Sequence, residues 1–563
     1  MVTDVSSAPN ELLADYAQGS YGARVRTSNI AAAVAVADTV RTTLGPQGMD
    51  KLIVDKTFDI TGNAIVTNDG VTILREMDVE NPAADLLIET ALEQETRVGD
   101  GTTTVVLLAG ALLREAARLI EDGVHPSTVI GGYHLASEQS LELLDRIAID
   151  CEDSHEKQLA LIATAMTGKS NGPETRPVAK LILDALLGVR DRDEGIDTEN
   201  VKIIPRTGGA ITDTTVIDGL LLEKERVHSG MPIGAEDTTI ALLDGSIQFD
   251  EHSVVPKVDS DEAFQISDSD TYDSILEYQD DHVESLVSKF VEIGAEVVFV
   301  RRYIDDRAQH YLARNGIFAV RQVDQEDIHR LARVTDGRIV GKIDEFTSAD
   351  LGRAERVLQE EIAGREMVRV EGVPNGGSVT MLLRSGTEHV LEELERTITD
   401  GIAAGRLGIE EGLVLPGAGA VEAELATELR TSATSVPTRE QLAVESYAEA
   451  LEIVPRTLAR NAGHDVLDTL LRIRTAHENG DPYVGVGEGT DGLANAVESS
   501  VLEPLEVKRR AIQAATEVAS MVLRVDGVIA TEPLSDEEWD EVAERVEHGE
   551  EKEEATENVV SER

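Results

Sequence analysis

The stretch that decides the fold is TRVGDGTTTVVLLAG, residues 96–110, in which a Gly-Asp-Gly turn is followed by three threonines. Apolar residues recur at helical spacing on both sides of the turn, over 83–92 and over 105–116. We therefore expect one helix to end at the turn and another to begin directly after it. The glycines permit unusual backbone conformations, and the first N–H groups of the new helix have no partner within it. Such a helix start favours an anion, most often phosphate.

Asp100 lies in the middle of this turn, where its carboxylate would repel phosphate groups. A divalent metal ion between the two removes the repulsion, and magnesium is usually held by one or two carboxylates together with phosphate oxygens. The turn therefore predicts a magnesium-nucleotide site. The alternative interpretation is an ordinary helix start with an aspartate in the turn.

The charge of the chain excludes one class of function and suggests an environment. Its 563 residues include 51 basic and 107 acidic side chains, a net charge of -56, which argues against a general nucleic-acid binder. Residues 535–563 contribute -10, so most of the charge is spread over the rest of the chain. An acidic, lysine-poor body suits a cytosol rich in salt, where charges are screened. We therefore hypothesise a halophilic source, with an ordinary acidic protein as the alternative.

Cysteine usage and the apolar runs bear on the location of the protein. Cys151 is the only cysteine, which excludes intrachain disulfides and cysteine-based metal sites. The apolar runs are too short to span a membrane, and the first ten residues contain no basic region followed by an apolar core. We therefore expect a cytoplasmic protein without a membrane partner.

The pattern along the chain is helical, then mixed, then helical again. Residues 27–44 form an alanine-rich helical pattern that ends at a Gly-Pro turn, and 49–75 are predicted to form short strands and turns. Between about 201 and 343, β-rich runs alternate with helical segments, which indicates an α/β domain. The helical pattern returns from about 386 to 525. This order predicts one helical domain interrupted by an inserted α/β domain.

Further glycine-rich turns lie in the two helical parts. TTLGPQGMDK (42–51) and PGAGAVEAEL (416–425) each contain an open backbone turn that could approach phosphate. VTNDGVTIL (66–74) is predicted to place Asp69 in a turn between two strands. TGKS (167–170) resembles the end of a Walker A loop, but alanine stands at 163, where that motif requires glycine, so a Walker A loop is excluded. Each turn alone fits a helix-ending turn equally well.

Taken together and in this order, these motifs resemble the group II chaperonins of archaea and the eukaryotic cytosol, also called thermosomes. The resemblance extends from about residue 22 to 530. It is carried by RTTLGPQGMDKLI, VTNDGVTIL and QETRVGDGTTT, with further support from KERVHSGMP (224–232), IDDRAQHYLARNGI (304–317) and VLEPLEVKRRAIQAA (501–515).

The resemblance implies a multi-domain α and α/β fold. A mostly helical equatorial domain would be formed by both chain ends, residues 1–148 and 404–530. A small intermediate hinge domain would comprise 149–215 and 369–403. The inserted α/β apical domain would occupy 216–368, with a helical lid protrusion at about 249–283. Residues 531–563 would form an acidic disordered tail.

The same resemblance implies an ATP-dependent chaperone and an ATPase. ATP and Mg²⁺ would be its cofactors, with K⁺ as a further one. Its partners would be unfolded client proteins and identical or paralogous subunits, assembled in a double ring of about sixteen. ATP binding and hydrolysis would drive closure of the lid over the client.

Residue by residue, the family motifs imply a complete ATP site. Asp100 would be the magnesium ligand, and Asp69 and Asp400 would orient or deprotonate the attacking water. Lys169 would sense the γ-phosphate, and Glu503 would meet the ribose hydroxyls. The remaining residues would contact the nucleotide chiefly through the backbone: Leu44, Gly45, Pro46, Gly99, Gly101, Thr102, Thr103 and Thr104 near the phosphates, and Gly417 and Gly419 at the nucleoside.

Three positions depart from the family pattern. Thr399 replaces a frequent histidine, Ala418 interrupts a usual glycine triplet, and Arg97 replaces a common glutamate. None of these changes removes a group that the chemistry needs.

Two other classes of function stay open from the residues alone: a self-contained ATPase or kinase with a small-molecule substrate, and a non-enzymatic scaffold. Three aspartates in one site argue against a scaffold, because buried like charges are costly without a metal.

Overall fold

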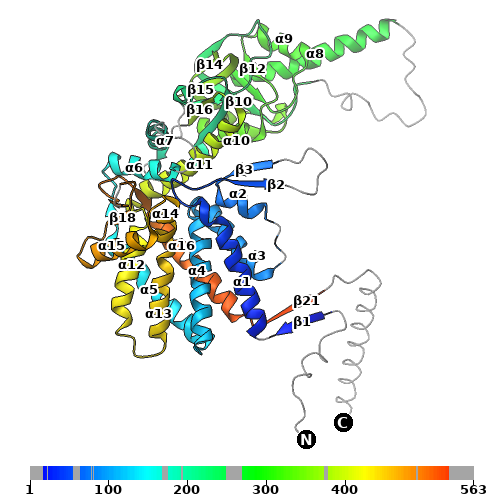
Figure 1. The fold of residues 1–563 in the computed structure, drawn as a ribbon. Helices are drawn as coiled ribbons and strands as arrows, with labels where there is room; N and C mark the ends of the chain where they lie inside the picture. The colour runs from blue at the N-terminus through cyan, green and yellow to red at the C-terminus, as the bar shows by residue number, and fades with distance from the viewer. Residues whose placement is uncertain are drawn as a thin grey trace, which may run out of the picture.

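The computed structural model places three regions one above another, with a helical body below, a smaller central region and an α/β region above (Figure 1). Within the residues that the structure describes, no helix is long and apolar enough to cross a membrane. The described residues are 17–21, 23–54, 64–77, 79, 81–167, 175–191, 195–248, 269–372, 378–489 and 492–531.

The helical body is built from both ends of the chain around one core. Tyr133 and Tyr447, one from each part of the chain, are fully buried and meet edge to face with ring centroids 5.5 Å apart. At the edge of the body, strand β1 (Ala17–Tyr21) pairs antiparallel with β21 (Gly527–Thr531). The helices of the body are α1 (Ala23–Val40), α3 (Pro82–Val98), α4 (Thr102–Glu121), α5 (Pro126–Ile147), α12 (Ala420–Ala433), α13 (Glu440–Leu451), α14 (Ile453–Asn461), α15 (Val466–Glu478) and α16 (Leu505–Arg524).

Short strands extend from this body. β2 (Lys51–Val54) and β3 (Ala64–Thr67) form an antiparallel hairpin that projects sideways in Figure 1. Two further small sheets lie near the central region, and the first of them joins segments that are distant in sequence. They involve β4 (Ile149–Asp150), β17 (Leu413–Pro416) and β20 (Leu502–Pro504) in one sheet, and β18 (Val484–Val486) with β19 (Leu493–Asn495) in another.

The predicted turn between strands at Asp69 is wrong. β3 ends at Thr67, and a short helix, α2 (Gly70–Arg75), begins directly after Asp69. The carboxylate of Asp69 accepts hydrogen bonds from the backbone N–H of Thr72 at 2.9 Å and from its hydroxyl at 2.8 Å. An aspartate that caps a helix N-terminus in this way stabilises it enough to outweigh the strand preference of the β-branched residues that follow.

The central region combines segments from before and after the α/β region. β7 (Val201–Thr207) pairs parallel with β16 (Val379–Ser385), which pairs antiparallel with β8 (Thr215–Asp218). Ile182, Met381 and Ile398 are buried together in its core. Its helices are α6 (His155–Met166), α7 (Thr175–Gly188) and α11 (Glu388–Glu411), beside a small pair formed by β5 (Arg190–Asp191) and β6 (Gly195–Ile196).

The upper region is a seven-stranded sheet with apolar packing on both faces. In β11 (Val297–Val300), Val298 and Val300 belong to one buried cluster, and Val297 and Phe299 belong to another. The sheet runs β12-β11-β10-β14-β15-β9, with β13 beside β10. The other strands are β9 (Leu220–Leu222), β10 (Gly234–Leu243), β12 (Phe318–Val320), β13 (Ile339–Val340), β14 (Gly352–Ile362) and β15 (Arg365–Glu371), and the helices are α8 (Ser269–Ile293), α9 (Asp306–Arg314) and α10 (Gln325–Thr335).

The predicted fold class, a multi-domain combination of helical and α/β parts, is confirmed. The motif at 304–317 forms α9, whose Ala308 and Leu312 are fully buried, as a core helix requires. Of the predicted lid, 249–268 lie outside the described residues, and 269–283 lie in α8, which projects from the upper region in Figure 1. The predicted tail lies outside the described residues from 532 onward.

Candidate functional site

A cavity of about 790 Å³ lies where the body meets the central region, and both parts of the chain line it. The structure brings most of the predicted site residues to this cavity: Leu44, Gly45, Pro46, Asp69, Gly99, Asp100, Gly101, Thr102, Thr103, Thr104, Asp400, Gly419 and Glu503. Gly417 adjoins it, since a Cβ at this position would lie 2.9 Å from Glu503 Oε1. Lys169 lies outside the described residues.

The Gly-Asp-Gly turn joins two helices at the edge of the cavity. Gly99 ends α3 with φ 69°, and Gly101 precedes α4 with φ 84°, both in the left-handed region that favours glycine. The close neighbours of the turn require glycine as well. A Cβ at Gly99 would lie 2.5 Å from Ala403 Cβ, and a Cβ at Gly101 would lie 2.9 Å from Val507 Cγ1. The turn therefore lies tightly between α11 and α16.

Gln94, which the sequence analysis did not single out, holds this turn in place through hydrogen bonds of its side chain. Its buried amide donates one hydrogen bond to the carbonyl of Asp100 at 3.1 Å and another to that of Val507 at 3.2 Å. The Asp100 carboxylate accepts a hydrogen bond from the N–H of Gly101 at 2.6 Å. Gln94 is the polar residue on the otherwise apolar buried face of α3, and this unusual position could have pointed to its role from the sequence.

Three helices begin at the cavity, and in none of them does the preceding residue cap the helix with its own side chain. Gly101 precedes α4, Gly419 precedes α12 and Pro504 precedes α16, and all three residues line the cavity. Uncapped helix starts present N–H groups and the positive end of the helix dipole. At α16 the N–H of Glu506 already donates to the Glu411 carboxylate, so the starts of α4 and α12 are the ones suited to an anion such as phosphate.

The Leu44-Gly45-Pro46 turn also lines the cavity. Asn461, at the end of α14, donates hydrogen bonds from its side chain to the carbonyls of Leu44 at 2.9 Å and Arg41 at 3.3 Å. A Cβ at Gly45 would overlap the side chain of Leu458 on the same helix. The turn is thus held against α14, and Asn461 is a second residue that the sequence analysis missed.

The carboxylates of the cavity come from separate segments. Asp400 is on α11 of the central region, whereas Asp69 and Asp100 belong to the body. Glu95, which the sequence analysis did not select, also lines the cavity and accepts a hydrogen bond from the Thr102 hydroxyl at 2.9 Å. Within the described residues, no group of three or more acidic, histidine or cysteine side chains could hold a metal ion alone. The donors fit a magnesium ion held by one carboxylate together with ligand oxygens.

A buried lysine lies at the floor of the cavity between two glutamates. The Lys508 ammonium contacts Glu422 at 2.6 Å and Glu503 at 2.7 Å. Burial raises the pKa of Glu503, as do the charges of Glu422 and Asp100, and Lys508 opposes this. Burial acts to lower the pKa of Lys508, but the two carboxylates outweigh it and raise that pKa. We call Glu422, Glu503 and Lys508 the lysine cluster.

Ala418 lines the cavity in a conformation that explains why glycine is usual there. Its φ is 60°, in the left-handed region where an alanine is strained. Its carbonyl accepts a hydrogen bond from the N–H of Val486 at 2.9 Å, which ties the start of α12 to β18. The alanine is therefore accommodated at a cost in backbone energy. Arg97, another departure, forms an exposed ion pair with Glu93.

Comparisons with known proteins agree over nearly the whole chain. The family model described as the TCP-1/cpn60 chaperonin family matches residues 36–533. Thermosome subunit 1 of Haloferax volcanii is 45% identical over 528 residues, covering 94% of this chain and 92% of that protein. The thermosome subunit alpha of Halobacterium salinarum is 44% identical over 536 residues, covering 95% of this chain and 93% of that protein. The open-state monomer of a group II chaperonin from Methanococcoides burtonii aligns with a TM-score of 0.61 and 36% identity, covering 76% of this chain and all of that one.

Proposed function

Because the chain belongs to the TCP-1/cpn60 chaperonin family and is a group II chaperonin subunit, we propose that its cavity binds and hydrolyses magnesium-ATP. The observation that carries this proposal is the meeting of the starts of α4 and α12 with Asp69, Asp100 and Asp400 around one cavity. The helix starts supply N–H donors for phosphate oxygens, and the carboxylates supply a metal ligand and acceptors for a proton.

In the proposed reaction, water attacks the γ-phosphorus of ATP, and ADP and phosphate leave. A bound magnesium ion would neutralise charge on the phosphate oxygens. Asp100 would hold that ion, while the N–H groups at the start of α4 would hold the oxygens in place. Asp69 or Asp400 would orient the water and take its proton. Lys169, outside the described residues, stays a predicted γ-phosphate contact.

The experiment that tests this function measures magnesium-dependent ATP affinity and phosphate release by the full-length protein. Asp100→Ala should abolish the magnesium dependence of binding. Asp122→Ala is the matched control, because Asp122 is exposed at the other end of the same helix, α4, away from the cavity. If the unmodified protein binds no magnesium-ATP, the proposal is wrong and a non-enzymatic scaffold is favoured.

The coupling of hydrolysis to movement follows from where the carboxylates lie. Asp400 is on α11, a helix of the central region, which connects directly to the upper region through β16. A shift of α11 relative to α3 and α4 would move Asp400 relative to the phosphates. We infer that ATP binding and hydrolysis alter the upper region by this route and that closure of the predicted lid at about 249–283 encloses an unfolded client protein in the cytoplasm.

The β2–β3 hairpin supports assembly with further copies of the chain. Leu52 and Val66 lie directly opposite each other on one face and are 65% and 64% exposed, and Val54 is also exposed. On the other face, Ile53 packs against the core of the body. A solvent-exposed apolar face on a two-stranded hairpin is a surface for a partner, and in a ring of subunits that partner is a second copy.

Sedimentation tests this assembly and its salt dependence together. Leu52→Asp combined with Val66→Asp should prevent double-ring formation, whereas Ile233→Asp, at a similarly exposed position in the upper region, should not. Intact rings should loosen at low salt, since the screening length is about 10 Å at 0.1 M and about 3 Å at 1 M. Rings of the hairpin variant that are as stable as those of the unmodified protein would rule out this contact.

A further inference from the structure

Lys508 has no part in the reaction proposed above, yet its charged side chain is buried, which is energetically unfavourable. The residue is only 5% exposed, at the floor of the cavity, and its ammonium group makes close ion pairs with Glu422 and Glu503. A buried charge is costly unless partners compensate it, so a lysine here calls for a reason. Its neighbours on α16, such as Ala511 and Ile512, are buried apolar residues.

The contacts of Lys508 join three elements at one nitrogen atom. Lys508 is in the first turn of α16, Glu422 is in the first turn of α12, and Glu503 is on β20. β20 and α16 contribute to the cavity wall, and α12 begins directly after Gly419, which also lines it. The ammonium group therefore fixes the position of the Glu503 side chain relative to both helix starts.

Glu422 and Glu503 differ in how much of their side chains is exposed. The side chain of Glu422 is only 4% exposed, and its Oε2 is buried without a hydrogen-bond partner, so its charge is compensated chiefly by Lys508. The side chain of Glu503 is 24% exposed and lines the cavity. Its Oε2 contacts Lys508, and its Oε1 lies near Gly417, which adjoins the cavity. Glu503 is thus held at one oxygen by Lys508, while its side chain lines the cavity.

Charge balance makes this arrangement depend on Lys508. The groups that face Glu503 are Glu422 from α12, Asp100 from the turn before α4 and Lys508 from α16, so two negative charges oppose one positive charge. Without the ammonium group, Glu503 would be favoured to take up a proton or to turn away from Glu422. A protonated or displaced carboxyl would no longer present an ionised acceptor oxygen to a ligand.

We propose that Lys508 is a positioning residue that keeps Glu503 ionised and turned into the cavity, where its Oε1 distinguishes a ribonucleotide from a 2′-deoxyribonucleotide. This inference rests on the proposed ATP site, in which Glu503 meets the ribose hydroxyls. An ionised carboxylate accepts a hydrogen bond from the 2′-hydroxyl, and the deoxy analogue leaves that acceptor without its donor. Lys508 acts through Glu503 and does not touch the nucleotide.

The test compares the affinities of ATP and 2′-deoxy-ATP for the full-length protein by calorimetry with magnesium present. The unmodified protein should prefer ATP by about tenfold or more, the effect of one hydrogen bond to a charged group. Lys508→Met should reduce the preference to about twofold or less, and Lys508→Arg should restore part of it. Glu503→Gln should also lose the preference, and adding Lys508→Met to it should change the ratio no further.

Lys202 provides the matched control. It is another buried lysine, paired with Asp327 at 2.6 Å, but its partner lies on α10 of the upper region. Lys202→Met removes a buried ion pair in the same way and should leave the ATP to deoxy-ATP ratio unchanged. If Lys508→Met does not fold, Lys508→Met combined with Glu422→Gln removes one positive and one negative charge together, and this double variant should also lose the preference.

The outcomes separate the two proposals. If the unmodified protein binds neither nucleotide, the proposed ATP site fails and the role of Lys508 fails with it. If Glu503→Gln loses the preference while a folded Lys508→Met variant keeps it, the ATP site stands and the positioning role is wrong. A further loss on adding Lys508→Met to Glu503→Gln would also overturn the proposal, since Lys508 would then act independently of Glu503.

Discussion

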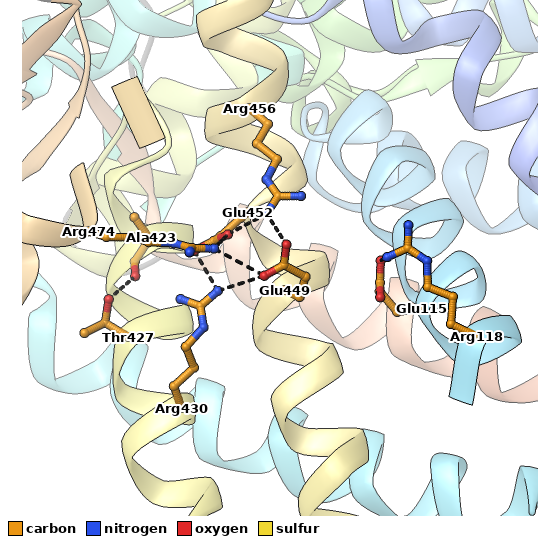
Figure 2. Close-up of polar contacts among 9 residues, drawn as sticks. All are labelled: Glu115, Arg118, Ala423, Thr427, Arg430, Glu449, Glu452, Arg456 and Arg474. Atoms are coloured by element: carbon orange, nitrogen blue, oxygen red, sulfur yellow. Dashed lines mark hydrogen bonds and ion pairs between the residues drawn. The ribbon is translucent and has the colours of Figure 1, made fainter. Parts of the chain in front are cut away.

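The body contains two ionic clusters with opposite charge balances. The lysine cluster has two carboxylates and one ammonium group and opens to the cavity. The second cluster, which we call the arginine cluster, has three guanidinium groups and two carboxylates (Figure 2). It consists of Arg430, Glu449, Glu452, Arg456 and Arg474.

The carboxylates of the arginine cluster are saturated with donors. Glu452, only 1% exposed, accepts hydrogen bonds from Arg430 at 2.7 Å, Arg456 at 3.0 Å and Arg474 at 2.6 Å. Glu449 pairs with the same three arginines. The planar fork of a guanidinium suits such multiple pairing. The cluster joins α12, α13, α14 and α15 and offers no acceptor to a ligand.

The difference teaches what each cluster can do. Where donors are in excess, every carboxylate is satisfied internally, and the cluster stabilises the packing of helices. Where carboxylates are in excess, one acceptor stays available, and in the lysine cluster that acceptor faces the cavity. Removing a charge should therefore affect ligand binding or turnover at the cavity and folding stability at the arginine cluster.

The largest effect is expected from a cavity carboxylate outside both clusters. Asp400→Ala should lower ATP turnover by about 10²- to 10⁴-fold, the range for loss of a general base, because Asp400 lies at the cavity on α11. ATP affinity should change little, since the proposed metal ligand and the helix starts are retained. Single-turnover phosphate release and equilibrium binding measure the two quantities. Turnover at the unmodified rate would show that Asp400 is not the base.

The next effect tests the arginine cluster. Glu452→Gln should lower the free energy of unfolding by about 1 to 2 kcal/mol, because three guanidinium groups, each 31% exposed, lose one of their two charged partners. Glu115→Gln is the control, since the Arg118 that pairs with Glu115 in Figure 2 is 64% exposed and the pair should contribute less than about 1 kcal/mol. Denaturant unfolding gives both values. Equal losses in the two variants would contradict the structural role of the cluster.

The two clusters should also respond to pH with opposite signs. Burial acts to raise the pKa of Glu449, but the hydrogen bond and charge of Arg456, with Arg474 and Arg430, outweigh it and lower that pKa. Stability from Glu449 is therefore present above the ordinary glutamate pKa and is lost as pH falls through the lowered one. The pKa of Glu503 is raised, so its contribution is present below the ordinary pKa and is lost as pH rises through the raised one.

Unfolding at a series of pH values in Glu449→Gln and Glu503→Gln measures these slopes. The stability of the unmodified protein relative to Glu449→Gln should increase with pH over the acid range. Relative to Glu503→Gln it should decrease as pH rises above the ordinary glutamate pKa. The same sign for both differences would show that the two clusters do not differ in the way their contacts indicate.

Local signals were sufficient to predict part of this molecule from the sequence. The Gly-Asp-Gly turn and its flanking helices follow from glycine positions and helical periodicity within a few residues. The strand assignment around Asp69 failed because a single capping hydrogen bond decided the conformation. Assembly of the cavity was anticipated only through the family resemblance, because its walls come from distant segments.

The residues that support the site could not be predicted because their partners are remote. Gln94 contacts the backbone of Val507, 413 positions away, and Asn461 holds the carbonyl of Leu44 across 417 positions. Lys508 appears in the sequence as a charged residue within a helical pattern that continues through Ile512 and Ala515. A charged residue on an apolar face indicates a buried partner, but not which one, since that depends on how α12 and β20 pack.

The smallest effect is expected at Ala418, beside the lysine cluster, where strain lies in the backbone instead of in charges. Ala418→Gly should raise the free energy of unfolding by about 0.5 to 1 kcal/mol, because relief of the left-handed strain exceeds the added chain entropy of glycine. The gain is limited because the Ala418 methyl packs near Gly485 of β18.

Ala363→Gly, at φ 53° in the exposed turn between β14 and β15, is the matched control and should stabilise similarly. ATP affinity should change by less than about threefold in Ala418→Gly, since the net gain of at most about 1 kcal/mol belongs to folding and the substitution removes no group that the proposed site uses. Destabilisation by Ala418→Gly together with stabilisation by Ala363→Gly would show that the methyl contact at β18, and not backbone strain, dominates at this position.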